Sequence, residues 1–97
     1  MSCPATSSGL KSADAAILVG RGELCGVILL GDGTNAASIV IHDNASAASG
    51  TELYKASVDA GLTESSIMLP IPVAANAGLY ANVTGTGAEY IVLYRKG

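Results

Sequence analysis

The triplet His42-Asp43-Asn44 has the strongest chemical potential in the chain, because it brings an imidazole and a carboxylate together at the end of an apolar segment. Such a pair is typical of general acid–base sites. Neighbouring residues of a strand point to opposite faces, so His42 and Asp43 are not expected to touch. The chain's one histidine also has no evident nucleophile or second base. The triplet therefore predicts a structural or surface histidine and an aspartate that begins a turn by accepting backbone N–H bonds, with no catalytic residues.

Two glycine-rich loops resemble ligand-binding loops but lack the residues that such loops require. Residues 31–35 (GDGTN) carry oxygen-bearing side chains that suit calcium, yet the alternating acids and closing glutamate of an EF-hand are missing. Residues 85–87 (GTG) are not followed by a segment with helical periodicity, whose N-terminus could hold a phosphate. We interpret both loops as turns and predict no metal site and no cofactor.

The cysteines and tyrosines are the remaining side chains of interest. The sequence shows no secretion signal, so we expect a reducing compartment in which Cys3 and Cys25 are free thiols, with a disulfide between them as the less favoured alternative. The four tyrosines either form a carbohydrate-stacking patch or fill the core and a subunit interface. We favour the second role in a chain without Phe or Trp; the residues are Tyr54, Tyr80, Tyr90 and Tyr94.

Composition narrows the class of protein. The chain has 97 residues, enough for one domain, of which 49% are hydrophobic and 13% charged, with a net charge of −3. Its five basic residues form no stripe, so nucleic acid is not an expected partner. The apolar runs, Val27–Leu30 among them, are far too short to span a bilayer, so no membrane is expected either. So little charge indicates that some apolar surface is covered in the working state.

Short β-strands must position these residues. Apolar alternation and turn clusters predict seven strands and no helix. A flexible N-terminal arm is predicted over 1–14 and a single domain over 15–97. Two prolines indicate that segment 66–73 lies at a sheet edge or forms a ladder along only part of its length. The pattern predicts an all-β, antiparallel β-sandwich, compatible with a jelly roll, with a small closed barrel as the alternative. The expected strands are 15–19, 23–30, 37–43, 51–58, 66–73, 78–84 and 88–95.

The pairing of these strands can also be predicted. Segments 24–30 and 38–41 are expected to form a central β-hairpin through the 31–35 loop, and segments 78–84 and 88–95 a second hairpin. Strands 23–30 and 88–95 are apolar on both faces, which favours a subunit interface in a dimer or trimer. The residues assigned to this interface are Cys25, Val27, Leu29, Tyr90, Val92 and Tyr94.

Residues 20–95 resemble a family of small β-sandwich proteins found in the virions of tailed bacteriophages. The resemblance rests on a Gly-Asp-Gly turn, a strand ending in Asp-Asn, a small-residue loop and a closing segment of the form GLYxxVTGTGAxxxVxY; these lie at 31–35, 39–44, 46–51 and 78–94. It implies a virion structural protein, above all a head decoration (cement) protein. Such a protein would be made in the host cytoplasm, would act on the phage head surface as a homo-oligomer, and would have the major capsid protein as its partner.

Three functions follow from these observations. A capsid-stabilising structural protein is the favoured interpretation, and we expect no enzyme. The alternative is a module on a head or tail fibre that binds a host-surface glycan or receptor, which requires an exposed aromatic groove. A small enzyme, the third possibility, would need a pocket around His42.

Overall fold

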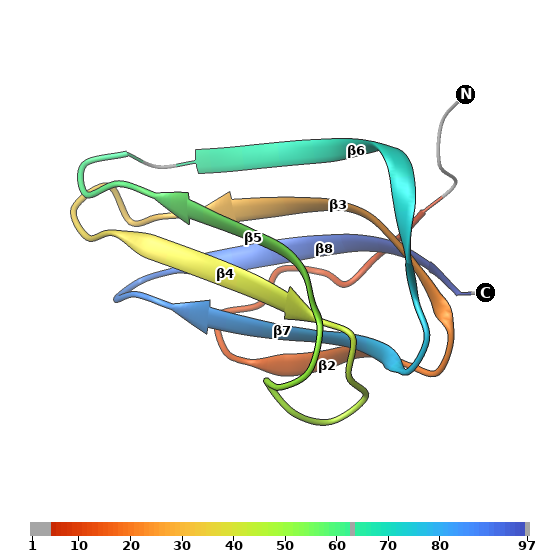
Figure 1. Cartoon of the computed structure of the whole chain (residues 1–97). Coiled ribbons are helices and arrows are strands. Elements are labelled where there is room, and N and C mark those ends of the chain that lie inside the picture. The colour runs from red at the N-terminus through yellow and green to blue at the C-terminus, as the bar shows by residue number, and fades with distance from the viewer. Residues whose placement is uncertain (1–4, 63, 97) are drawn as a thin grey trace.

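The protein is a β-sandwich of two four-stranded sheets (Figure 1). The computed structural model describes residues 5–62 and 64–96, and for residues 65–72 the backbone alone. This part of the chain contains eight strands and no helix, so the predicted fold class is confirmed with one strand more than expected. The strands are β1 (Thr6–Ser7), β2 (Ala15–Val19), β3 (Gly22–Leu30), β4 (Ala37–His42), β5 (Glu52–Val58), β6 (Glu64–Ala75), β7 (Gly78–Thr84) and β8 (Glu89–Lys96).

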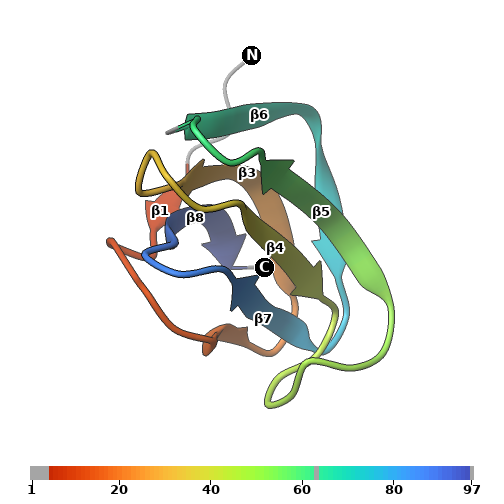
Figure 2. The same cartoon turned by 90° about the vertical axis from the view of Figure 1, so that its left-hand side faces the viewer.

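The strand order defines a jelly roll. Sheet I has the order β1-β8-β3-β6, sheet II has the order β2-β7-β4-β5, and all neighbours are antiparallel. The pairs β1·β8, β2·β7, β3·β6 and β4·β5 are those of one long double ribbon that turns back between β4 and β5. Wrapping this ribbon places its strands alternately in the two sheets (Figure 2), which is the eight-stranded jelly-roll arrangement.

Both predicted hairpins are wrong. β3 lies in sheet I and β4 in sheet II, so the glycine-rich loop between them carries the chain across the sandwich. β7 and β8 are separated in the same way. An arch between sheets uses the same Gly, Asp and Asn residues as a hairpin turn, so the local sequence does not distinguish the two connections. β4 and β5 are the one pair of consecutive strands that forms a hairpin within the described chain.

The core lies between the sheets and is built from one face of each strand. On β3, Leu24, Val27 and Leu29 are buried, whereas Ile28 and Leu30 are only partly buried. A change of register between Leu24 and Gly26 interrupts the alternation. Each large aliphatic side chain buried in this way stabilises the fold by about 1.5–3 kcal/mol. The largest fully buried side chains are Tyr90, Leu24, Leu29, Ile39, Ile41, Leu79, Val27, Val92 and Cys25.

The residues predicted to form a subunit interface lie inside the single chain. Cys25, Val27, Leu29, Tyr90 and Val92 are each at most 1% exposed, and Tyr94 packs against the core. The structure therefore corrects this assignment: the chosen residues have the inward parity of their strands and form the core. The alternate positions of the same two strands face away from the other sheet. Their apolar residues are partly exposed and lie outside the core cluster; they are Ile28, Leu30, Ile91 and Leu93.

Part of the predicted N-terminal arm belongs to the sandwich. β1 pairs with β8, so that Thr6 lies opposite Tyr94. The Ser8 amide donates to the Val92 carbonyl over 2.9 Å, and the Ser8 hydroxyl accepts from the Val92 amide over 2.8 Å. Lys11 and Tyr90 exchange two backbone hydrogen bonds of 2.9 and 2.8 Å. Residues 1–4 of the arm lie outside the described residues, but from Thr6 onward the chain covers part of the β8 edge.

Candidate functional site

Asp43 fastens the end of β4 to the turn between β6 and β7. Its Oδ1 accepts the amides of Ala77 and Asn76 over 2.8 and 3.0 Å, with a longer bond of 3.4 Å from Gly78. These donors, that of Ala77 above all, lower the pKa of the Asp43 carboxyl. Asp43 does accept backbone N–H groups as predicted, but from a turn more than thirty residues away in the sequence.

His42 is buried on sheet II, with 6% of its surface exposed. Its register partners are Tyr80 on β7 and Glu52 on β5. Its Nδ1 atom is buried without a hydrogen-bond partner in the described part of the chain. The carboxylate of Asp43 accepts backbone amides, and no hydrogen bond joins it to His42 in the described residues. The described residues also contain no group of three or more His, Cys, Asp or Glu side chains that could hold a metal ion.

The two glycine-rich loops hold one end of the sandwich together. Asp32 Oδ1 accepts the amides of Thr34 and Asn35, each over 2.8 Å, and these bonds lower the pKa of the Asp32 carboxyl. Gly87, at φ +73°, lies so close that an added Cβ would be 2.8 Å from the Asp32 Cβ. A Cβ at Gly85 would lie 2.4 Å from the Ala36 carbonyl oxygen. Asp32 therefore fixes its own loop by hydrogen bonds, and the two connections approach each other closely at Gly85 and Gly87.

The tyrosines contribute chiefly to the core. Tyr90 is fully buried and its hydroxyl donates to the Ala13 carbonyl over 2.6 Å. Burial, followed by the nearby Asp14 and Tyr80, raises the pKa of Tyr90 to about 12. Tyr54 and Tyr94 also pack against the core. Three of the four tyrosines are thus engaged in the interior, which leaves no basis for an aromatic binding patch made from the whole set.

The expectation that Cys25 is a free thiol is wrong. It is fully buried on β3 and disulfide-bonded, not a free thiol. The chain's other cysteine, Cys3, lies outside the described residues.

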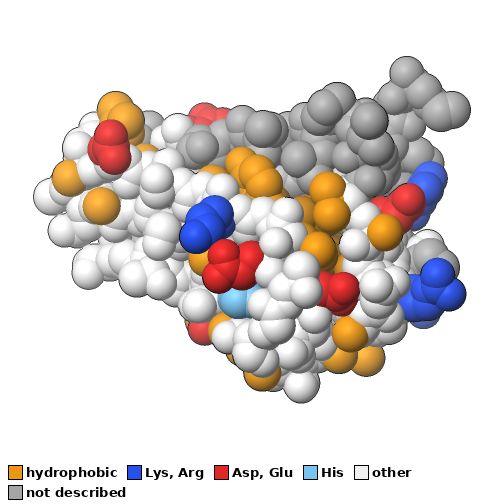
Figure 3. All heavy atoms as spheres, in the orientation of Figure 1, with side chains coloured by type: hydrophobic (Ala, Val, Ile, Leu, Met, Phe, Trp, Pro, Cys, Tyr) orange, Lys and Arg blue, Asp and Glu red, His pale blue; other side chains and the backbone are white. Residues whose placement is uncertain are grey.

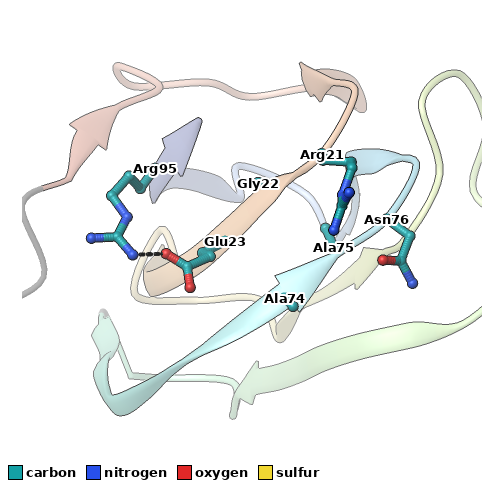
Figure 4. A pocket seen from close by; sticks show the side chains of 7 residues that line it. All are labelled: Arg21, Gly22, Glu23, Ala74, Ala75, Asn76 and Arg95. Carbon is teal, nitrogen blue, oxygen red and sulfur yellow. Dashed lines mark hydrogen bonds and ion pairs between the residues drawn. The ribbon is translucent and has the colours of Figure 1, made fainter. Parts of the chain in front are cut away.

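An open hollow of about 500 Å³ lies where β3 begins and β6 and β8 end (Figure 4). The guanidinium of Arg95 forms an ion pair with Glu23 across part of it. The Arg21 side chain lies on the other side, next to Asn76. The lining offers charge and hydrogen bonding, so the hollow could recognise a polar group; it consists of Arg21, Gly22, Glu23, Ala74, Ala75, Asn76 and Arg95.

The outward faces of the two sheets differ in character. On sheet I, Ile28 lies directly opposite Ile91, and Leu93 lies opposite Gly26. We call the partly exposed set Ile28, Leu30, Ile91 and Leu93 the outer row. On sheet II the corresponding positions are largely polar, with Ser38 opposite both Ser57 and Thr84. Figure 3 shows charged side chains scattered over the sheet II side without a patch of one sign. The outer row is the candidate binding surface.

The sequence indicated apolar residues on both faces of β3 and β8, but it did not indicate which face is covered by sheet II. The residues predicted for the interface lie on the inward face of these strands, and the outer row lies on their opposite face. Neither the family models, the curated proteins nor the solved structures with which the chain was compared match it. No helix in the described residues is long and apolar enough to cross a bilayer. Fold and surface thus define a jelly-roll domain with an apolar outward face on one sheet.

Proposed function

We propose that the protein is a structural subunit of a tailed-phage virion, and specifically a decoration protein that binds the outer shell of the head. The outer row is the observation that carries this proposal. The core of the single chain is already complete between the sheets, so the outer row has no role in it. The outer row is bordered by charge at Leu30, whose register partners are Glu64 and Glu89. An apolar surface with such a polar rim on a small domain is typical of a protein–protein contact.

Fold and sequence support the viral setting in different ways. Jelly rolls occur in viral capsid proteins as well as in lectin domains and cupins, so the fold alone does not choose a function. The resemblance of residues 20–95 to small virion proteins favours the viral use. The tyrosines packed into the core do not favour the glycan-binding alternative.

The physical action of such a protein is to bury surface at a junction between capsid subunits. The domain is a flattened body of 37 × 31 × 20 Å, whose sheet I side can lie on a shell. Each aliphatic side chain of the outer row that a capsid protein covers adds to the hydrophobic gain, at roughly 25 cal/mol per Å² of apolar surface. The partner is the major capsid protein, and the protein joins the head after both have been made in the host cytoplasm. No covalent step is involved.

Binding to heads assembled without this protein tests the proposal. We expect the wild type to co-sediment with such heads saturably. The double variant Ile28→Lys/Ile91→Lys should lose this binding, because lysine places charge on the outer row. Leu62→Lys is the matched control, since Leu62 is 56% exposed outside sheet I. Thermal unfolding of each variant verifies its fold.

Two results would count against the proposal in different ways. Heads that fail to bind the folded wild type would remove the decoration function. Heads that bind the double variant as tightly as the wild type would remove the outer row as the contact surface.

A further inference from the structure

The sandwich has four sheet edges, and three of them carry devices that oppose pairing with another chain. β1 is only two residues long. β6, which ends sheet I as its prolines predicted, contains Pro70 and Pro72, and proline has no amide hydrogen to donate. β5, at one end of sheet II, carries exposed Glu52 and Lys55 as an ion pair of 3.4 Å. Short strands, prolines and edge charges are the usual means of blocking edge-to-edge association.

β2 forms the fourth edge and has none of these devices. It ends sheet II beside β7, at the lower margin of the sheet in Figure 1. Its sequence, AAILV, contains no charge, proline or glycine. Val19 at its end is 70% exposed, the highest value among the large hydrophobic residues of the described chain. β2 is therefore an apolar strand edge whose one irregularity is a change of register between Ala16 and Leu18 in its pairing with β7, and it carries no charge or proline to oppose another strand.

β2 has a negative charge at one end and a positive charge at the other. A two-fold rotation that pairs β2 with a second copy of itself brings opposite charges together. Asp14 precedes the strand and Arg21 follows it after Gly20. Arg21 is exposed and takes part in none of the ion pairs found in residues 5–62 and 64–96. Antiparallel pairing of β2 with its own copy sets the beginning of one strand beside the end of the other. The Asp14 carboxylate, whose Oδ1 accepts the Val83 amide of its own β7 over 2.8 Å, then lies near the Arg21 guanidinium of the neighbouring copy and attracts it with its negative charge.

We propose that two copies of this chain associate through β2, antiparallel and about a two-fold axis, so that their sheets II join into one continuous sheet. The surface is self-complementary in backbone hydrogen bonding, apolar character and flanking charge, as an isologous interface requires. The outer row lies on sheet I and stays open in this dimer. The inference therefore does not depend on the proposed function.

The oligomeric state across a concentration series, measured by native mass spectrometry and sedimentation velocity, tests this inference. We expect the wild type to be a dimer at the upper end of the series. Val19→Lys adds a charge at a side chain that is already exposed and should raise the dissociation constant about tenfold or more, as edge lysines do by opposing strand pairing. Leu62→Lys is the matched control and should leave the constant unchanged.

A charge variant and hydrogen exchange locate the contact. Arg21→Glu should weaken the dimer, and added salt should weaken the wild-type dimer more than this variant. The amides of residues 15–19 should exchange more slowly in the dimer than in the Val19→Lys monomer. A wild type that stays monomeric throughout the series would overturn the inference. So would a Val19→Lys variant that dimerises as tightly as the wild type. Neither result bears on binding to heads.

Discussion

At the scale of single residues, polar side chains mostly serve to fix connections. Asp43 shows this most clearly, because the carboxylate that suggested acid–base chemistry is held by the amides of residues 76–78. The sequence predicted that Asp43 accepts backbone hydrogen bonds. It could not predict the donors, because the turn that supplies them comes near only when the ribbon is wrapped.

Asp43→Asn should destabilise the fold in a pH-dependent way. Hydrogen bonds to a charged acceptor contribute about 1.5–3 kcal/mol. The neutral carbonyl oxygen of asparagine still accepts amides, so the free energy of unfolding at neutral pH should fall by a part of that amount, about 1 kcal/mol. The pKa of Asp43 is lowered on folding, so the unfolded chain binds a proton first as the pH drops below about 4. This contribution is therefore full above that pH and is lost in more acid solution. Denaturant unfolding at a series of pH values should show a shallower acid dependence in the variant; an unchanged slope would contradict the assignment.

Gly87 tests the contact between the two glycine-rich connections. Gly87→Ala should lower stability by more than Gly61→Ala, because both residues have positive φ but an added Cβ meets Asp32 only at Gly87. Gly61 has open space around it, so its variant measures the backbone strain alone, about 1–2 kcal/mol. Equal losses in chemical denaturation would show that the connections do not press on each other.

At the scale of elements, the strands could be predicted and their partners could not. The bounds of six strands, all of those expected except β6, were predicted to within a residue, because alternation and turn residues are local signals. The two glycine-rich connections were interpreted as hairpins because turn chemistry says where a chain reverses, not which sheet it enters. β1 was missed because two polar residues, Thr6 and Ser7, carry no strand pattern.

Ser8→Ala tests whether the segment after β1 is fixed to β8. The change removes the hydroxyl that accepts the Val92 amide and leaves that amide without its partner. We expect a loss of about 1–2 kcal/mol in the free energy of unfolding and faster exchange of the Val92 amide. Ser12→Ala is the control, since Ser12 is exposed and no hydrogen bond of its hydroxyl is seen in the described chain. A freely moving arm would give no difference between the two variants.

At the scale of the whole molecule, the topology is dominated by partners that are distant in sequence. β1 pairs with β8, β2 with β7 and β3 with β6, so most of the sheet closes long loops. Such folds form in milliseconds to seconds, because the entropy of loop closure is lost before the pairings compensate for it. Stopped-flow refolding should show this timescale, and relaxation in microseconds would contradict the wrapped topology. The β4·β5 hairpin, as the local pair, is expected to form early.

The pairing of β1 with β8 brings the first and the last strand of the chain side by side. A circular permutant that links residue 5 to residue 96 and is opened within the exposed residues 46–50 would keep every strand pair. In that polypeptide β1 and β8 become sequence neighbours, while β4 and β5 become the terminal strands. Architecture and chain order are thus separable in this domain.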